Sequence, residues 1–349
     1  MLLPVGLPQV VWLAERADEI RQFTKLPLAD VEKIKLFENK QATYNLSVKL
    51  NIPTPLTFFP KDRLDADICA AQLKPPIVVK HCTKSGSAWL KYAKTAEEAV
   101  RFYERMRDLE SKMDKNDIYT EGSLFELKTS LRGTKQTNSE LKIAENDGRV
   151  VPHVETSNFK LQTDQTIMFQ EYLSGGGYGF FGLYNKGVFK QGFAHKRIRE
   201  FPVSGGASCC AESIENEELM TYGRRILETI DWHGLAMVEF KMDSKGQLRL
   251  LEVNPKLWGS FDLSVASGVP FAEKWVKLAM NQPIFDHQDY EKGVRFSWLM
   301  DGDLKNGLQT GKFWSILRGP FFDKKTRTNL TWRDPLASLF LIASGFKLR

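Results

Sequence analysis

Apolar residues recur at regular spacing along the chain, and the pattern predicts a mixture of helices and strands. Helical spacing of apolar positions predicts helices over residues 11–23, 30–50, 95–109, 217–230 and 270–280. Short apolar runs bounded by Gly, Pro, Asn or Asp predict strands over residues 75–80, 166–173, 179–184, 188–194, 234–242 and 248–255. Weaker strand signals lie at residues 124–130 and 141–145, within a polar stretch.

Local signals support the ends of some of these elements. Asp30 is placed to cap the helix over residues 30–50, and Thr95 with Glu98 forms a capping box before the helix that follows. Residues 2–5 resemble a strand and precede the helix predicted over residues 11–23, so we expect the chain to begin inside a βα unit. Because one strand cannot form a sheet, it either docks elsewhere on the chain or belongs to a domain whose remainder is missing.

Three polar side chains stand on two adjacent predicted strands that are otherwise apolar. Glu239 lies on the first strand, and Glu252 and Asn254 lie on the second, two residues apart and therefore on one face. Oxygen ligands of this kind suit Mg²⁺ shared with the phosphates of a nucleotide. The alternative is a solvated polar face of a hairpin. The Leu, Ala, Met, Val and Phe residues around them favour burial, and buried carboxylates need a partner or a metal.

The expected register of this hairpin brings the carboxylates near each other. Residues 243–246 form the turn, so Met242 is expected to pair with Gln247. Glu239 then lies opposite Leu250 and diagonal to Glu252, about 7–8 Å away.

Composition is that of a globular protein with two or three domains or lobes. The chain has 349 residues, of which 42% are hydrophobic and 26% charged. The formal net charge is +6, with Lys and Arg scattered among acids, so no nucleic-acid-binding footprint is indicated. Anionic substrates such as nucleotides would explain the bias.

No two of the four cysteines have CxxC spacing, and two of them, Cys209 and Cys210, are adjacent. This spacing disfavours a structural disulfide and a zinc site, and we expect a reducing, cytoplasmic location. No apolar run has the length of a membrane span, and no signal-peptide pattern opens the sequence.

Two glycine-containing segments are candidates for phosphate binding. Lys80 ends an apolar strand and precedes a loop with Ser85 and Gly86, where a lysine and backbone N–H groups can reach phosphate oxygens. Taken alone, an ordinary strand-end lysine is the favoured interpretation. Residues 177–182 match GxGxxG literally, but a strand follows instead of the helix that a dinucleotide site requires. We therefore expect these glycines to form a mobile linker.

A basic strand follows at residues 194–202. Arg197 and Arg199 are two apart and are expected to share a face, which suits recognition of phosphate or carboxylate. A solvated strand edge explains the pattern equally well. His195 has no nucleophile in a suitable position, so no catalytic triad is predicted, and no catalytic cysteine is indicated.

Taken in order, these motifs resemble those of the ATP-grasp superfamily. The matching segments are Asn39-Lys40, Ile77-Val78-Val79-Lys80, Gln170-Glu171-Tyr172-Leu173, Val238-Glu239-Phe240 and residues 251–260. The resemblance covers about residues 31–285. It is closest to the carbamoyl-phosphate-synthase-like ATP-grasp proteins, many of which are presumed carboxylate–amine ligases.

The resemblance implies an α+β fold of the ATP-grasp type, in which two α+β lobes clasp the nucleotide. Residues 1–30 would be a truncated remnant of an α/β pre-grasp domain. Residues 31–285 would form the ATP-grasp domain, with a small lobe at about 55–170 and a large lobe at about 171–285. Residues 286–349 would be a C-terminal extension. A partner chain or a missing N-terminal segment would supply the rest of the pre-grasp domain.

The resemblance also implies an ATP site with Mg²⁺. Lys40 and Lys80 would contact the phosphates, beside Ser85 and Gly86. Backbone groups of Glu171 and Leu173 would bind adenine N6 and N1, with Gln170 and Tyr172 near the base. Glu239, Glu252 and Asn254 would hold Mg²⁺, and Arg197 and Arg199 would face the transferred phosphate or the substrate.

The implied reaction joins a small-molecule carboxylate to an amine. The carboxylate attacks the γ-phosphate to form an acylphosphate, and the amine then displaces phosphate. Lys256 stands where the family usually has Arg after Asn-Pro, which preserves the charge but loses the bidentate fork. The acid that often contacts the ribose is absent, and Gly177 or Tyr178 occupies that region. A non-catalytic or split-enzyme ATP-binding subunit is the alternative that these departures raise.

The tail over residues 311–349 carries Trp314, Trp332 and several Phe among basic residues. Packing against the core is the favoured expectation for its apolar stretch at 336–348, over contact with a partner or a membrane surface.

Overall fold

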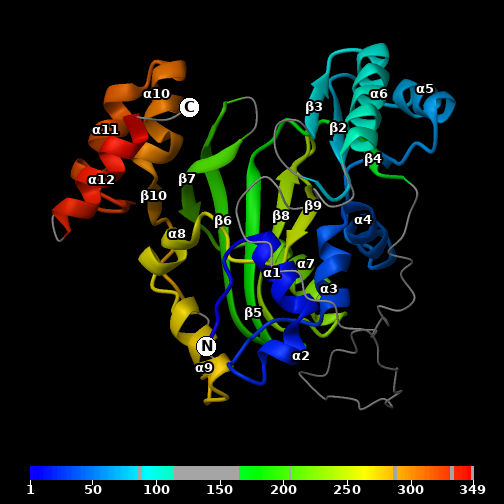
Figure 1. The fold of residues 1–349 in the computed structure, drawn as a ribbon. Helices are drawn as coiled ribbons and strands as arrows, with labels where there is room; N and C mark the ends of the chain where they lie inside the picture. The colour runs from blue at the N-terminus through cyan, green and yellow to red at the C-terminus, as the bar shows by residue number, and fades with distance from the viewer. Residues whose placement is uncertain (85–88, 114–164, 204–205, 286–288, 331–333, 347–349) are drawn as a thin grey trace.

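Two β-sheets organise the chain in a computed structural model that describes residues 1–84, 89–113, 165–203, 206–285, 289–330 and 334–346. The small sheet has four strands in the order β1-β4-β2-β3, and the large sheet has seven in the order β11-β10-β7-β6-β5-β8-β9. The small sheet stands at one end of the molecule, beyond the ends of β8 and β9 (Figure 1). The predicted strands at residues 124–130 and 141–145 lie outside the described residues.

The small sheet is covered on one face by two helices. Its strands are β1 (Thr57–Phe58), β2 (Ile77–His81), β3 (Leu90–Ala93) and β4 (Ile167–Glu171), and its helices are α5 (Arg63–Ala71) and α6 (Ala96–Lys112). Alternation along β2 sends Ile77 and Val79 into a core with Phe169 and Tyr103. Lys80 therefore emerges on the opposite face. The Thr95 hydroxyl caps α6 by accepting from the Glu98 N–H, as predicted.

The large sheet is buried on both faces. Its strands are β5 (Gly177–Asn185), β6 (Val188–Phe201), β7 (Ala207–Ser213), β8 (Gly234–Met242), β9 (Leu248–Asn254), β10 (Arg295–Ser297) and β11 (Thr326–Thr328). One face packs on α1 (Leu7–Glu15), α3 (Val31–Glu38), α4 (Lys40–Lys49) and α7 (Glu217–Glu228), and α2 (Ala17–Ile20) lies beside them. The other face packs on α8 (Phe261–Ala266) and α9 (Phe271–Ala279). Neighbouring residues on β5 illustrate this, because Phe180 enters the first core and Phe181 the second.

The N-terminal region differs from its prediction in two places. Residues 2–5 form no strand, and the following helix instead packs Val10 and Val11 into the core of the large sheet. The predicted helix over residues 30–50 is broken at Asn39, whose backbone is extended (φ −88°, ψ 110°). The Asn39 side chain accepts hydrogen bonds from the N–H groups of Gln41 and Ala42 and so starts a new helix, α4. Asp30 occupies the N-cap position of α3 without a side-chain cap bond.

The glycines at residues 177–182 are part of β5, and the predicted mobile linker is wrong. A Cβ on Gly179 would lie 2.7 Å from the Phe181 ring and 2.9 Å from the His195 ring. A side chain on Gly177 would meet Arg197 at 2.8 Å. These positions thus lack side chains because neighbouring rings and the methylene groups of Arg197 fill the space. The turn at 185–187 is confirmed, with positive φ at Lys186 and Gly187.

Two stretches of chain cross from one sheet to the other, and hydrogen bonds join them. The Leu250 N–H of β9 donates to Pro53 O at 2.8 Å. Three residues further on, Leu56 exchanges two bonds with Glu171, one from its N–H to the Glu171 carboxylate and one to its carbonyl from the Glu171 N–H. We call residues 53–57 and 171–177 the paired crossings.

The C-terminal part consists of η3 (Leu299–Asp303), α10 (Leu304–Thr310), α11 (Phe313–Phe322) and α12 (Pro335–Phe346) at the β10–β11 edge of the large sheet (Figure 1). The expected packing of the apolar tail against the core is realised on one side of α12 only, where it contacts η3. Leu336, Leu339 and Phe340 are exposed. No helix among the described residues combines the length and apolar content that a membrane crossing requires.

Candidate functional site

Glu239 and Glu252 lie directly opposite each other on β8 and β9. The predicted diagonal arrangement is wrong, because Met242 pairs with Leu248 instead of Gln247, and a bulge follows Glu239. The turn accounts for one residue of this difference, because the Asp243 N–H donates to the Gln247 carbonyl and the Asp243 carboxylate accepts from the Gln247 N–H, both at 2.9 Å. The bulge accounts for the second residue. Opposed like charges destabilise a strand pair, so this arrangement needs compensation.

Asn254 bridges the two carboxylates, as the convergence predicted from the sequence requires. Its Nδ2 donates to Glu239 Oε1 at 3.1 Å and to Glu252 Oε1 at 3.0 Å. The described residues contain no group of three His, Cys, Asp or Glu side chains that could hold a metal. A divalent cation here would therefore be bound by two carboxylates and the Asn254 amide oxygen, which needs the amide turned over. The donor set is that of a hard cation.

Arg197 compensates Glu239 from β6, across the intervening strand β5. Its NH2 lies 2.5 Å from Glu239 Oε2, and its NH1 lies 3.4 Å from Glu200 Oε1. Its buried Nε has no partner among the described residues. Burial raises the pKa of Glu239, and the charge of Glu252 adds to that, while Arg197 and Lys256 oppose it.

Glu252 is compensated by two lysines, Lys80 of the small sheet and Lys40 of α4. Burial alone would raise its pKa, but Lys40, Lys80 and the Asn254 amide hold the pKa below its usual value. In turn, burial lowers the pKa of Lys80 to about 8. The charge of Lys40 also lowers this pKa, whereas the charge of Glu252 raises it. The two predicted lysines and the carboxylates of the hairpin therefore face one another across the space between the sheets.

Lys40 stands at the first turn of α4, where the chain touches β2 of the small sheet. Its backbone N–H donates to Cys82 O at 2.9 Å, and its Nζ lies 3.5 Å from Cys82 O and 3.4 Å from Lys84 O. The break at Asn39 creates this position, because a continuous helix would not place a free N-terminal turn there. Ser85 and Gly86 lie outside the described residues.

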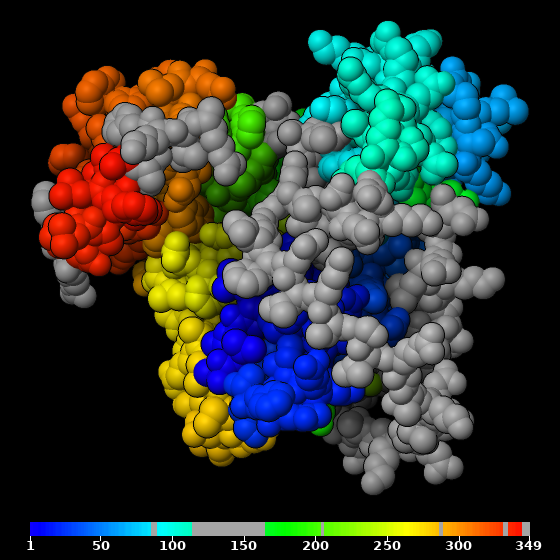
Figure 2. Space-filling view, in the orientation of Figure 1, coloured from blue at the N-terminus to red at the C-terminus, as the bar shows by residue number. Residues whose placement is uncertain are grey.

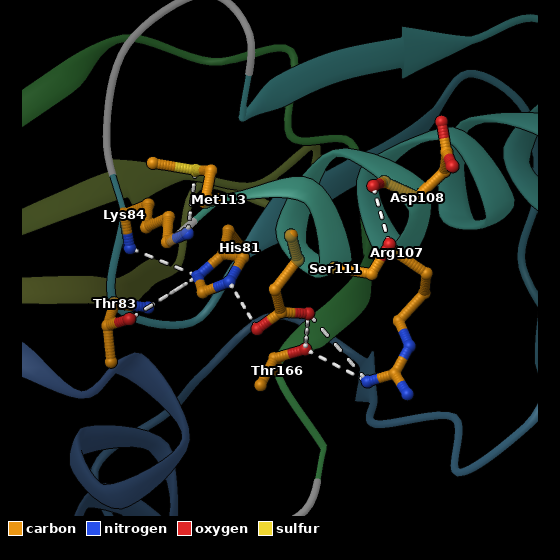
Figure 3. A network of polar contacts seen from close by, with 9 residues as sticks. His81, Thr83, Lys84, Arg107, Asp108, Ser111, Met113 and Thr166 are labelled. Carbon is orange, nitrogen blue, oxygen red and sulfur yellow. Dashed lines mark hydrogen bonds and ion pairs between the residues drawn. The ribbon is translucent and has the colours of Figure 1, made fainter. Parts of the chain in front are cut away.

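His81 organises the chain directly after Lys80 (Figure 3). Its Nδ1 accepts from the backbone N–H groups of Thr83 and Lys84, each at 3.1 Å. Its Nε2 lies 3.3 Å from Glu110 Oε1, and the other Glu110 oxygen accepts from the Thr166 hydroxyl at 2.7 Å. Burial lowers the pKa of His81 to about 4, so the ring is neutral and Nδ1 can accept. Sequence reasoning missed this residue, and its only signal was its place after the strand-end lysine.

The predicted adenine-binding segment lies at the end of β4. Gln170 is buried and donates to the Thr57 hydroxyl at 2.8 Å, so its side chain points toward β1. Glu171 is held by Leu56 through both its side chain and its N–H. The Leu173 N–H makes no hydrogen bond with another described residue.

Two tyrosines border the same segment. Tyr172 is partly exposed, with its ring 5.9 Å from that of Tyr92 and 5.2 Å from Lys241 Nζ. Tyr178 lies on β5, with its hydroxyl 4.0 Å from Met242 Sδ. Tyr172 thus has the more open aromatic surface of the two.

Arg199 does not join Arg197. A register shift separates them on β6, so the expectation of a shared face is wrong. Arg199 binds Asp303 in a bidentate pair, with Nε at 2.6 Å and NH2 at 2.8 Å. Asp303 is fully buried and also accepts from the Ser297 hydroxyl at 2.5 Å. The four cysteines, Cys69, Cys82, Cys209 and Cys210, are free and buried.

Comparisons with known proteins agree with this geometry. Residues 163–301 match the model of a family described as ATP-grasp in the biosynthetic pathway with Ter operon. A search of curated proteins gives no match.

Three solved structures illustrate the structural likeness. The biotin carboxylase domain of 2-oxoglutarate carboxylase from Hydrogenobacter thermophilus, solved with MgADP and bicarbonate, has a TM-score of 0.56 at 15% identity and covers 81% of this chain and 55% of its own. Biotin carboxylase from Campylobacter jejuni gives 0.56 at 13%, covering 83% and 61%. L-amino acid ligase from Bacillus licheniformis gives 0.54 at 13%, covering 83% and 60%.

The chain thus spans between 55% and 61% of the length of these three structures. Likeness at this level of identity establishes the fold. The two-sheet fold and the structural likeness show that the chain has the ATP-grasp fold, and residues 163–301 match a family of that fold.

Proposed function

We propose that the chain binds MgATP between its two sheets and uses it to join a carboxylate to an amine through an acylphosphate. The observation that carries this proposal is the cluster in which Lys40 and Lys80 face Glu252 and Glu239. These four charged groups come from α4, from β2 of the small sheet and from β8 and β9 of the large sheet. A polyphosphate and a divalent cation between them would satisfy all four.

The phosphates would lie against Lys40 and Lys80. Among the described residues, Lys40 Nζ contacts the carbonyls of Cys82 and Lys84, at distances of 3.4–3.5 Å. These long contacts leave the ammonium group available to phosphate oxygens, with Ser85 and Gly86 proposed beside it.

Adenine would bind at the end of β4, among Gln170, Glu171, Tyr172 and Leu173. The Leu173 N–H makes no hydrogen bond with another described residue, which supports a contact with a ring nitrogen, and the Glu171 carbonyl would accept from the amino group. Tyr172 would contact the base with its exposed ring surface, and Tyr178 would border the ribose.

Glu239, Glu252 and Asn254 would hold Mg²⁺. The cation would neutralise charge on the transferred phosphoryl group. Arg197 already pairs with Glu239, so it would keep that carboxylate charged and oriented. Lys256, whose charge also acts on Glu239, would approach the substrate acid.

The chemistry asked of the protein is positioning and charge neutralisation. The substrate carboxylate attacks the γ-phosphorus in line, ADP leaves, and the amine then displaces phosphate from the acyl carbon. Arg199 is bound to a buried aspartate, and we propose that it braces β6 instead of contacting the substrate.

A non-catalytic ATP-binding subunit is the second candidate, and Lys256 in place of the family's arginine favours it. Screening ADP release over pairs of carboxylic acids and amines tests the ligase. ATP binding without ADP release for any pair would favour the subunit.

ATP affinity should fall as pH rises through about 8, which is the pKa of Lys80. Below that pH the Lys80 ammonium is charged and can pair with phosphate, whereas above it the amine is neutral. We expect the Kd for ATP to rise about tenfold between pH 7 and 9.5. In Lys80→Arg the side chain stays charged, so this rise should disappear. Calorimetry at both pH values measures it, and an unchanged rise in Lys80→Arg would contradict the assignment.

Two substitutions of His81 should separate its two hydrogen-bonding roles. Asn presents an acceptor near the position of Nδ1, and Gln presents polar atoms near the position of Nε2. His81→Asn should therefore keep the bonds to the Thr83 and Lys84 N–H groups and bind ATP almost normally. His81→Gln should keep the Glu110 contact and weaken ATP binding about tenfold, since two N–H groups lose their acceptor. Equal ATP affinities of the two variants would argue against this role.

A further inference from the structure

The positive charge of the chain is concentrated at its C-terminal end. Residues 304–349 contain nine Lys and Arg and two Asp and Glu, a net charge of +7, whereas the whole chain carries +6. The preceding 303 residues therefore carry a net charge of −1. A segment of one sign on an otherwise balanced protein indicates a partner of the opposite sign.

The same segment exposes large apolar side chains on α11. Trp314, Phe321 and Phe322 are 68%, 64% and 81% exposed. Their helical spacing places them on one face together with Arg318, while Ile316 on the other side is buried. We call this set the α11 face.

Helix α12 has a second exposed stripe. Leu336, Leu339 and Phe340 are 78%, 61% and 73% exposed, at the i, i+3, i+4 spacing of one face. Leu341 and Ile342 lie on the other side and are half-buried. We call this set the α12 face. The α11 and α12 helices are neighbours on the side of the molecule away from the small sheet (Figure 2).

We propose that the α11 and α12 faces dock the chain onto an anionic lipid surface. Helices of this kind lie in the interface, with Trp, Phe and Leu inserted among the headgroups and Lys and Arg paired with lipid phosphates. A net charge of +7 together with exposed Trp, Phe and Leu side chains decides for lipid, because helices that bind anionic membranes share this composition. Lys312, Lys324 and Lys325 border the α11 face and are exposed.

Insertion and charge act together in this arrangement. Weak apolar insertion alone gives marginal binding, and a basic cluster converts it to stable binding on anionic membranes. The proposal is independent of ATP turnover, because the α11 and α12 faces contain none of the residues assigned to the nucleotide.

Cosedimentation of the full chain with vesicles tests the proposal. Vesicles of phosphatidylcholine alone are compared with vesicles of phosphatidylcholine and 30% phosphatidylglycerol. We expect binding to the anionic vesicles that falls steeply with added NaCl, and weak binding to the neutral ones. The double variant Phe321→Ser, Phe322→Ser and the double variant Lys324→Glu, Lys325→Glu should each lower partitioning at least about tenfold.

A matched control is Phe23→Ser, since Phe23 is equally exposed but lies near α2. It should leave vesicle binding unchanged, and all variants should keep the melting temperature of the parent. Equal binding of parent and both double variants would overturn the proposal. So would absence of vesicle binding together with a dimer in light scattering that the Phe321→Ser, Phe322→Ser variant dissociates, which would make the surface a contact between copies of the chain.

Discussion

Replacing Glu252 by Gln is expected to abolish ATP-dependent turnover, by at least about 100-fold in ADP release. Glu252 is the carboxylate on which Lys40 and Lys80 act, and it lies directly opposite Glu239. The amide keeps the size of the side chain but removes the charge that a divalent cation requires. ADP release measured with a coupled assay, on the acid and amine pair that the screen identifies, tests this expectation.

Glu212→Gln serves as the matched control for this substitution. Glu212 is another largely buried carboxylate of the large sheet, but it pairs with Lys196 and Arg295 on the far side of β6. Its variant should turn over normally. Full turnover of Glu252→Gln would refute the metal assignment, and equal loss in both variants would point to damage of the sheet.

Removing the Asp303 carboxylate is expected to be the most destabilising single change considered. Asp303→Ala leaves the Arg199 guanidinium without the partner that accepts two of its bonds, and Ser297 without its acceptor. Breaking one side of a buried ion pair costs about 3–5 kcal/mol. Urea unfolding followed by circular dichroism measures the change in the free energy of unfolding.

Asp301→Ala is the control for that prediction, because Asp301 is exposed and lies two residues away. Its free energy of unfolding should change by less than about 0.5 kcal/mol. The double variant Arg199→Met, Asp303→Leu should recover most of the loss, since it removes both charges together. A loss below about 1 kcal/mol in Asp303→Ala would show that solvent reaches Arg199 and replaces its partner.

The strand and helix order could be predicted because burial on the two faces of each sheet leaves a strong apolar pattern. The convergence of Glu239, Glu252 and Asn254 was predictable for the same reason. Their exact register was not, since it depends on the bonds between Asp243 and Gln247 in the turn and on the bulge after Glu239. The spacing of apolar residues does not reveal features of this kind.

Partners that are distant in sequence were also beyond prediction. Arg199 and Asp303 are 104 residues apart, and no local pattern connects them. The break at Asn39 was missed because both flanking helices keep their apolar spacing, while the capping bonds that separate them involve polar atoms. The role of His81 could not be predicted because its side chain accepts from backbone N–H groups. Every residue except proline has such a group, so they leave no pattern in the sequence.

The paired crossings have a mechanical consequence. The Leu56–Glu171 hydrogen bonds join the two crossings. Stretches joined in this way resist sliding and twisting but allow bending, so they can act as a hinge between the sheets. The proposed adenine contacts at Glu171–Leu173 lie at this hinge, whereas Lys80 lies further along β2 of the small sheet, beyond Ile77, which pairs with Glu171. A nucleoside would then bind without moving the two sheets relative to each other. Only a polyphosphate would draw the small sheet toward the large one.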